Sequence, residues 1–203
     1  MKLAILGASG RSGRHLVHQA LEAGHDVRVL VRSGVTFGLR AARLEVLVGD
    51  AENEAAVREL VSACDALVSA LGPRPDSPEA CSKAARNVVA SGVARYVAIS
   101  GAGLDVPGDQ KDHVGKVVSF FVRNLSPAIF QDKVREYQIL AASPLAWTLV
   151  RPPRLIDAPR RGRIKTSLLR CPGQSISRAD LAAFCLECIG DERLVGKAPF
   201  VSG

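Results

Sequence analysis

The chain has 203 residues, of which 47% are hydrophobic and 23% are charged, and its formal net charge is +7. This composition is ordinary for a globular protein that buries a substantial core. No stretch approaches the roughly 18 uninterrupted apolar residues of a membrane span, and the first apolar run lacks a signal-peptide cleavage site. We therefore expect a cytoplasmic protein with no membrane partner.

The excess of positive charge raises the question of a nucleic-acid partner. The densest basic run, at residues 159–170, has no interleaved aromatic residues on which bases could stack. A solvated or substrate-side loop is the favoured interpretation of this run, because short charge runs are usually solvated. An anionic cofactor would also favour positive potential, so a nucleic-acid partner is the minority interpretation.

The five cysteines do not form the pattern of a secreted disulfide framework. Cys185 and Cys188 are spaced one helical turn apart, but no second Cys pair or His pair completes a zinc site. We expect both to be small buried side chains and predict no metal.

Strand and helix patterns alternate along the chain. Apolar runs predict strands at residues 2–6, 26–31, 43–50, 65–71, 94–100 and 145–152, and a short last strand at 198–203. Helical spacing of apolar residues predicts helices at residues 13–24, 53–64, 77–92, 128–143 and 177–190. Between them, residues 101–116 form a Gly-rich polar stretch of the kind that often contributes to a site.

The strands read as near-continuous apolar runs, which indicates that helices cover both of their faces. The fold class predicted is therefore α/β, a single doubly wound, mostly parallel Rossmann-type sheet with helices on both faces. We expect one domain over residues 1–203, with a small C-terminal substrate-side portion from about residue 152 to residue 203.

Three glycines directly follow the first strand and open the first helix, in the spacing G-x-x-G-x-x-G. In such a β-turn-α unit, glycines permit the tight turn, the close approach of a pyrophosphate and the packing of the helix on the sheet. Amides at the helix N-terminus then face the phosphates. The predicted pyrophosphate-binding residues are Gly7, Ala8, Ser9, Gly10, Arg11, Ser12 and Gly13.

The second strand is followed by Arg32. An acidic residue near this position would bind the ribose 2′-hydroxyl of NAD, whereas arginine suits the 2′-phosphate of NADP. A guanidinium can hold a phosphate through two hydrogen bonds, and Arg11 lies where it could reach the same group. NADP(H) is therefore favoured over NAD(H).

With these motifs the chain resembles the atypical short-chain dehydrogenase/reductase group, especially its NmrA-like and biliverdin-IXβ-reductase (flavin reductase)-like members. The likeness spans nearly the whole chain, through GASGRSG, VLVRS, VLVGDAEN, DALVSALGPRP, RYVAISGAG, DKVREYQIL and WTLVRPPRL.

The resemblance implies further cofactor contacts along the ends of the strands. Asp50 and Ala51, after the third strand, would contact the edge of the adenine. Ala70, Leu71 and Gly72 would form the backbone that passes the ribose, and Arg74 would bind the cofactor just beyond them. Ser100 would lie beside the nicotinamide, Lys133 would reach the nicotinamide ribose, and the chain would bend past the carboxamide at Pro152 and Pro153. Other interpretations stay open for three of them. Asp50 could cap the next helix, Ser100 could bond within a turn, and Lys133 could be solvated.

One position departs from the family pattern. Relatives usually place a catalytic tyrosine four residues before the lysine, on the same helix face, but here that residue is Ile129. Tyr137 lies one turn to the other side of Lys133 and is not a matching replacement. This argues against carbonyl reduction driven by tyrosine. Histidine is a residue type whose ordinary pKa suits a proton donor, and this makes His113 a candidate donor, although a lone loop histidine is more often structural or solvated.

The biliverdin/flavin-reductase-like members imply a reaction that needs no tyrosine. The expected function is an NAD(P)H-dependent reductase that transfers hydride to a flavin, quinone or similar conjugated acceptor. Ser100 would orient the nicotinamide or acceptor, Lys133 would fix the ribose, and the loop at residues 109–113 would cover the acceptor.

The alternative is a non-catalytic NADP(H)-binding redox sensor of NmrA-like type, whose partner would be a regulatory protein. A sugar-nucleotide epimerase or dehydratase is disfavoured, because the chain after the sixth strand is short for a large substrate domain. We expect a monomer or a small homo-oligomer.

Overall fold

The computed structural model describes residues 1–33, 37–74, 76–110 and 126–203. Its centre is a six-stranded sheet with the order β3-β2-β1-β4-β5-β6, in which every neighbouring pair is parallel. The strands are β1 (Lys2–Leu6), β2 (Asp26–Val31), β3 (Leu44–Val48), β4 (Ala66–Ser69), β5 (Arg95–Ile99) and β6 (Ala146–Val150). This is the doubly wound Rossmann order, which confirms the predicted fold class.

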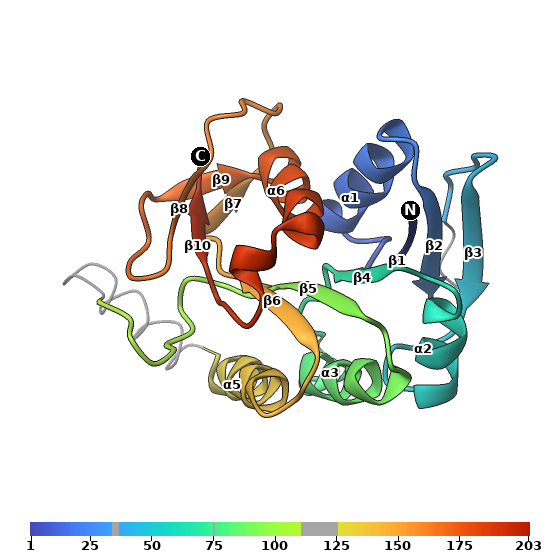
Figure 1. Ribbon diagram of the computed structural model, residues 1–203, viewed down its shortest axis with the longest axis horizontal. Coiled ribbons are helices and arrows are strands. Elements are labelled where there is room, and N and C mark those ends of the chain that lie inside the picture. The colour runs from blue at the N-terminus through green and yellow to red at the C-terminus, as the bar shows by residue number, and fades with distance from the viewer. Residues whose placement is uncertain (34–36, 75, 111–125) are drawn as a thin grey trace.

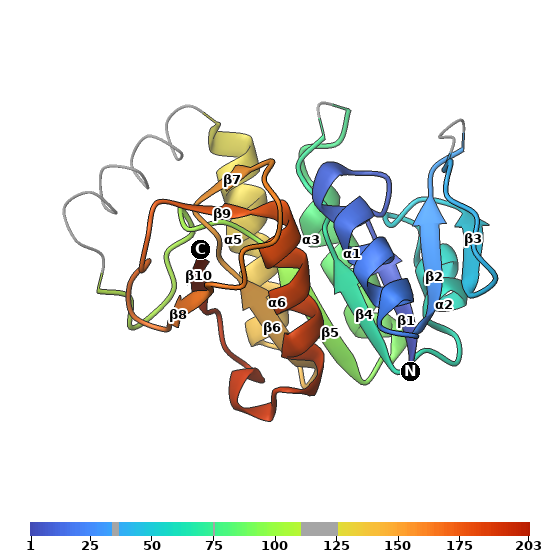
Figure 2. The same cartoon turned by 90° about the horizontal axis from the view of Figure 1, so that it is seen from above.

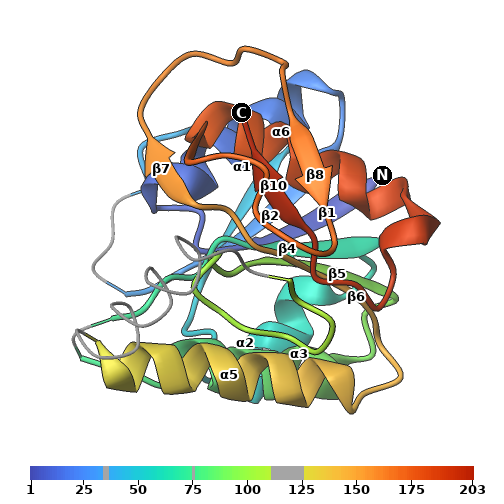
Figure 3. The ribbon, with the colours of Figure 1, turned by 90° about the vertical axis from the view of Figure 1, so that its left-hand side faces the viewer.

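Helices cover both faces of the sheet (Figures 1 and 3). One layer holds α1 (Arg11–Glu22) and α6 (Arg178–Gly190); the other holds α2 (Glu54–Val61), α3 (Ala80–Ser91) and α5 (Pro127–Ala141). The central strands are buried on both sides, and two apolar clusters form the core, one under each layer. Cys185 and Cys188 belong to the first cluster, in keeping with their prediction as buried small side chains.

The edge strand β3 differs from this pattern. Its neighbour β2 pairs with it on one side only, and the side chains of Glu45, Val46 and Val48 are exposed. The expectation that helices cover both faces of every strand is therefore wrong at β3. An edge strand lies at the limit of the helix layers, so an apolar run there does not guarantee burial.

The predicted start of one helix also needs correction. Residues 77–79 form a turn, and α3 begins at Ala80. The side chain of its N-cap residue, Glu79, makes no capping hydrogen bond to the amides of the helix. The helix ends at Gly92, whose φ of +74° gives the left-handed cap that glycine favours. The N-cap expected at α6 is confirmed, since the Ser177 hydroxyl accepts a hydrogen bond from the Asp180 amide.

The C-terminal segment adds two small sheets beside β6 (Figures 1 and 2). β7 (Arg154–Ile156) pairs in parallel with β9 (Ser175–Ser177), while β8 (Lys165–Ser167) pairs antiparallel with β10 (Phe200–Ser202). A 3₁₀ helix, η1 (Glu192–Leu194), precedes β10. The short last strand was predicted, but β7, β8 and β9 were not, because three-residue strands in a polar basic segment leave no periodic signal. Within the described ranges, no helix is both long and apolar enough to cross a membrane.

Candidate functional site

The carboxyl ends of β1 and β4 meet at the centre of the sheet. Their connections leave toward opposite helix layers, with β1 leading to α1 and β4 leading to α3. The two ends are joined directly, since the Ala70 amide donates to the Leu6 carbonyl at 2.9 Å. Open α/β sheets bind ligands in the crevice outside such a switch point.

The turn after β1 can be built only with glycine at two of its positions. Gly7 has a φ of +73°, and a Cβ there would lie 2.7 Å from the Ala70 carbonyl. A Cβ on Gly13 would lie 2.1 Å from the Gly7 carbonyl oxygen, so this glycine lets α1 pack onto the turn. Both roles match the glycine functions expected from the sequence.

The N-terminus of α1 faces this turn. Its N-cap is Gly10, which has no side chain to satisfy the first amides, and the first turn carries no acidic residue. Backbone amides and the helix dipole thus offer an anion site where the sequence predicted a pyrophosphate. The tight glycine turn and the uncapped amides fit the diphosphate of a nicotinamide dinucleotide.

Arg11 lies on this turn but pairs with the C-terminal segment. Its Nη1 is 3.6 Å from the carboxylate of Asp157, and both side chains are exposed. The same carboxylate accepts a hydrogen bond from Arg178 at 2.7 Å. The structure therefore links the start of α1 to the segment after β7 through an exposed ion pair.

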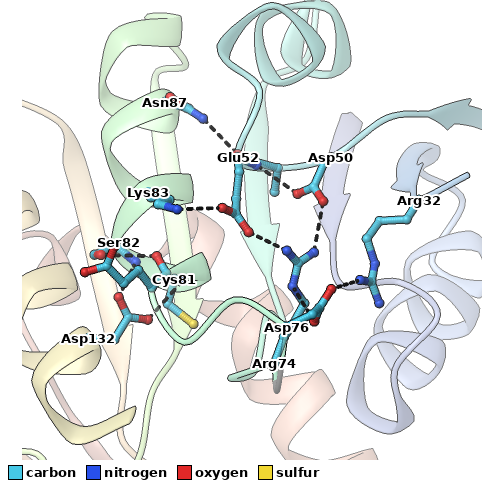
Figure 4. Close-up of polar contacts among 12 residues, drawn as sticks. Arg32, Asp50, Glu52, Arg74, Asp76, Cys81, Ser82, Lys83, Asn87 and Asp132 are labelled. Carbon is cyan, nitrogen blue, oxygen red and sulfur yellow. Dashed lines mark hydrogen bonds and ion pairs between the residues drawn. The ribbon is translucent and has the colours of Figure 1, made fainter. Parts of the chain in front are cut away.

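The expected adenosine end carries a chain of ion pairs (Figure 4). Arg74 donates from Nη1 to the Asp50 carboxylate at 3.0 Å and from Nη2 to Glu52. Asp76 lies between the guanidinium groups of Arg74 and Arg32. Three predicted cofactor residues, Arg32, Asp50 and Arg74, are thus brought together from the ends of β2, β3 and β4.

Asp50 is held ionised by these neighbours. Burial opposes ionisation, but the Glu52 amide and the Arg74 guanidinium outweigh it and keep the pKa of Asp50 below its usual value. The alternative that Asp50 caps the next helix is wrong, because Asn53 caps α2 by accepting from the Ala56 amide at 3.0 Å.

The network continues into α3. Glu52 accepts from the Lys83 ammonium at 3.0 Å, and the Asn87 amide donates to the carbonyl of Ala51, a predicted adenine contact, at 2.8 Å. Glu52, Lys83 and Asp76 were not singled out from the sequence. A signal was present for Glu52 and Asp76, since they lie in the segments that follow β3 and β4, and parallel strands end at one edge of a sheet. Lys83 lies within α3 and had no such signal.

Predicted cofactor residues Ala70, Leu71 and Gly72 form the segment that leaves β4. The Leu71 amide donates to Ser69 Oγ at 3.3 Å, which holds the segment across the end of the strand. Gly72 is exposed, with open space where a Cβ would be.

Ser100 lies at the end of β5, where its amide donates to the Val150 carbonyl at 2.8 Å. Its Oγ is buried and has no hydrogen-bond partner in the part of the chain that the structure describes. The alternative that this hydroxyl bonds within a turn is therefore not supported. A buried hydroxyl without a partner is costly, and a ligand group that reaches it would remove the cost.

Predicted residues Pro152 and Pro153 follow β6 beside this position. The Pro152 carbonyl accepts from the Ala102 amide at 2.8 Å, so the end of β6 lies against the segment after Ser100. The predicted carboxamide contacts and the predicted nicotinamide contact are therefore adjacent.

Lys133 is engaged within the protein. Its Nζ donates to the Ile99 carbonyl at 3.2 Å and to Glu136 at 2.8 Å, and its side chain is 14% exposed. The alternative that Lys133 is solvated is wrong. Burial disfavours the ammonium ion, but attraction to the Glu136 carboxylate outweighs it and keeps the pKa of Lys133 above its usual value. The i,i+3 spacing of the two residues could have revealed Glu136.

Tyr137 packs edge-on against Trp147 with ring centroids 6.0 Å apart, as expected for a residue that does not replace the missing tyrosine. His113 lies outside the described residues.

The described part of the loop after Ser100 is fastened by a buried ion pair. Asp109 accepts hydrogen bonds of 2.6 and 2.8 Å from the guanidinium of Arg151, which is fully buried at the end of β6. Arg151 also donates to the Leu104 and Ala198 carbonyls and lies 3.7 Å above the ring centre of Phe200. This pair connects the loop to the C-terminal segment.

Several solved structures share this fold. A short-chain dehydrogenase/reductase from Veillonella parvula DSM 2008, crystallised in complex with NADP, is 16% identical, with a TM-score of 0.81 over 100% of this chain and 94% of that one. A candidate NADH-flavin reductase from Streptococcus pneumoniae TIGR4 is 22% identical, with a TM-score of 0.80 over 100% and 99% of the two chains. ChuY, an anaerobilin reductase from Escherichia coli O157:H7, is 19% identical, with a TM-score of 0.77 over 100% and 97%.

At the level of sequence, the profile of a family described as NAD(P)H-binding matches residues 7–192. The match covers the glycine turn, the ion pairs after β3 and β4, and the ends of β5 and β6. The chain therefore belongs to the NAD(P)H-binding family.

Proposed function

We propose that this protein is an NADPH-dependent reductase that acts on a flavin, a quinone or a related conjugated acceptor such as a bilin. The similar folds of an NADH-flavin reductase candidate and an anaerobilin reductase support this acceptor class. The observation that carries the proposal is the buried hydroxyl of Ser100 at the carboxyl end of β5, which has no hydrogen-bond partner among the residues that the structure describes.

Each residue at this end of the sheet has a role in the proposal. A bound reduced nicotinamide supplies a hydride, and the accompanying proton comes from solvent or a weak acid. Ser100 binds the nicotinamide or the acceptor through its buried hydroxyl. Lys133 acts through the Ile99 carbonyl and holds the strand end on which Ser100 lies. His113 is proposed as a proton donor.

Two further parts of the chain complete the proposed site. The loop that Asp109 fastens would cover the acceptor, and residues from about 152 to 203 would form its substrate side. Orientation of two reactants in a water-excluding site accounts for much of the rate of such a transfer, so a catalytic tyrosine is not required.

The preference for NADPH over NADH is part of the proposal. Arg32 and Arg74 lie at the ends of β2 and β4, where the ribose of the adenosine would be bound. Two guanidinium groups at this point favour a 2′-phosphate over a 2′-hydroxyl.

The test is acceptor-dependent oxidation of NADPH by the purified protein, followed at the nicotinamide absorbance band. FMN, FAD, a quinone and a bilin would be compared. We expect turnover with at least one acceptor, a large loss of kcat/KM in Ser100→Ala, and little change of NADPH affinity in that variant. Equal turnover by wild type and Ser100→Ala would contradict the role of Ser100.

The alternative is a redox sensor that binds NADP(H) without turnover, and the isoleucine at position 129 favours it. Tight NADPH binding with no consumption by any acceptor in the panel would support this alternative and count against the reductase.

A further inference from the structure

Asp76 occupies the space between two arginines at the adenosine end of the site. Its Oδ2 is 3.1 Å from Arg32 Nη1, and its Oδ1 is 3.6 Å from Arg74 Nε. Each carboxylate oxygen thus faces a different guanidinium group. Figure 4 shows the three side chains converging, Arg32 from the end of β2, and Arg74 and Asp76 from the segment after β4. A phosphate bound by two arginines is surrounded in the same way.

The two arginines are not held equally. Arg74 is anchored by Asp50 and Glu52, and its side chain is 17% exposed. Arg32 is 47% exposed and donates a hydrogen bond to Asp76 at 3.1 Å. The Arg74 side chain is therefore held in place. The ion pair between Arg32 and Asp76 can break at a small cost in free energy, because it is exposed to solvent.

One donor at this position is left without an acceptor. Arg74 Nε is buried and has no hydrogen-bond partner in the described part of the chain, because 3.6 Å to Asp76 is too long for a hydrogen bond. The Asp76 carboxylate therefore does not satisfy all the guanidinium donors between which it lies. A group with more oxygens could satisfy both arginines.

The charges of the network also limit its attraction for a phosphate. The network holds three cationic side chains, Arg32, Arg74 and Lys83, and three carboxylates, Asp50, Glu52 and Asp76. The positive charge that would attract a phosphate is balanced within the protein, and Asp76 is the carboxylate shared by the two arginines.

We propose that Asp76 competes with the 2′-phosphate of NADP(H) for Arg32 and Arg74, and is thus a residue that determines the cofactor preference. This inference rests on the proposed binding of NADP(H). It predicts that the ratio of NADPH affinity to NADH affinity is smaller in the wild-type protein than in a variant that keeps both arginines but lacks the Asp76 carboxylate. Asp76 is a specificity residue that acts against the phosphorylated cofactor.

The test compares dissociation constants for NADPH and NADH in wild type, Asp76→Asn and Asp26→Asn. Asp26 is exposed at the opposite end of β2, so its substitution makes the same change of net charge far from the position. We expect Asp76→Asn to bind NADPH about tenfold more tightly, because a negative charge beside the phosphate is removed. NADH affinity changes less than about twofold, and Asp26→Asn leaves both constants near wild type.

Fragments and salt provide a second readout. The gain in Asp76→Asn is expected for 2′,5′-ADP but not for 5′-AMP, and it shrinks as ionic strength rises. Equal changes for NADPH and NADH, no change, or weaker NADPH binding would each overturn the competition. If wild type and Asp76→Asn bind neither dinucleotide, the proposed function itself fails, and the inference fails with it.

Discussion

Single residues around the glycine turn decide how closely α1 packs at the site, and Gly13 shows this most directly. Its α-hydrogen faces the Gly7 carbonyl oxygen, where even a methyl group has no room. The obstructing atoms belong to the backbone, so they cannot rotate away as a side chain would.

Gly13→Ala tests this packing. We expect the free energy of unfolding to fall by about 3 kcal/mol and dinucleotide affinity to be lost, because α1 must move off the turn. Chemical denaturation and calorimetric titration with NADPH would measure the two effects. Gly38→Ala is the matched control, since a Cβ there meets nothing within 4 Å and the residue is exposed; a similar loss in both variants would contradict the packing argument.

Arg32 tests the cofactor preference at the same scale. Arg32→Asp is expected to weaken NADPH binding by at least about tenfold more than NADH binding, because a guanidinium beside the phosphate becomes a carboxylate. Fluorescence titration with each dinucleotide would show the difference. Equal effects on both would remove Arg32 from the 2′-phosphate.

At the scale of elements, distant side chains satisfy several helix ends. Arg28, within β2, donates to the Glu59, Leu60 and Ser62 carbonyls at the end of α2. Arg95, within β5, does the same at the end of α6, with a hydrogen bond of 2.7 Å to the Cys188 carbonyl. A guanidinium both satisfies free carbonyls and suits the negative end of the helix dipole.

The N-terminus of α3 is completed in the same manner from α5. The buried carboxylate of Asp132 accepts from the Cys81 and Ser82 amides at 3.0 and 3.1 Å (Figure 4). This contact attaches the two helices and positions the start of α3, to which the Gly72–Arg74 segment leads.

Asp132→Ala is expected to lower the free energy of unfolding by about 2 kcal/mol, because two amides lose a charged acceptor in a buried place. Glu79→Ala provides the comparison, since Glu79 is at the N-cap position itself but only forms an exposed ion pair with Arg135. That variant is expected to lose less than about 1 kcal/mol. Urea denaturation would measure both losses. A larger loss in Glu79→Ala than in Asp132→Ala would refute capping by Asp132.

Over the whole molecule, the Asp109–Arg151 pair fastens the loop after Ser100 to the C-terminal sheets. Asp109→Ala is expected to cost about 3 kcal/mol, because Arg151 would remain charged and fully buried without its partner. Asp109→Asn keeps one oxygen acceptor and loses less. Denaturation midpoints would separate the variants, and an unchanged midpoint in Asp109→Ala would show that the pair does not hold the fold.

The free energy of unfolding of the whole chain is expected to fall at acid pH. Burial raises the pKa of Asp180, but hydrogen bonds from Ser177 and from the Gly162 and Arg161 amides outweigh it, so the pKa lies below its usual value. A carboxyl whose pKa is lowered in the folded state stabilises the protein above its unfolded pKa, and this contribution is lost as pH falls through the folded pKa.

The free energy of unfolding is therefore expected to be level near pH 7 and to fall below about pH 4. Urea denaturation at pH 7, 4.5 and 3.5 would trace this fall. In Asp180→Asn the fall should be smaller and the stability at pH 7 lower; an identical slope in both proteins would assign the acid sensitivity elsewhere.

The sequence alone determined the parallel doubly wound sheet and the glycine turn. Both follow from local rules: apolar runs of strand length alternate with helical spacing, and the turn at Gly7 and Gly13 tolerates no side chain. These signals lie within short windows of the chain, so they can be read without knowledge of distant contacts. The position of Arg32 after the second strand belongs to the same class.

Tertiary structure alone decided which charges meet. Asp76 lies 44 residues from Arg32, and the Asp132 carboxylate lies 50 and 51 residues from the amides that it accepts from. No local pattern specifies such pairs, because they depend on which strand ends become neighbours and on how helices stack across the sheet. The same reason explains why the exposure of β3 at the edge of the sheet emerged only from the folded chain.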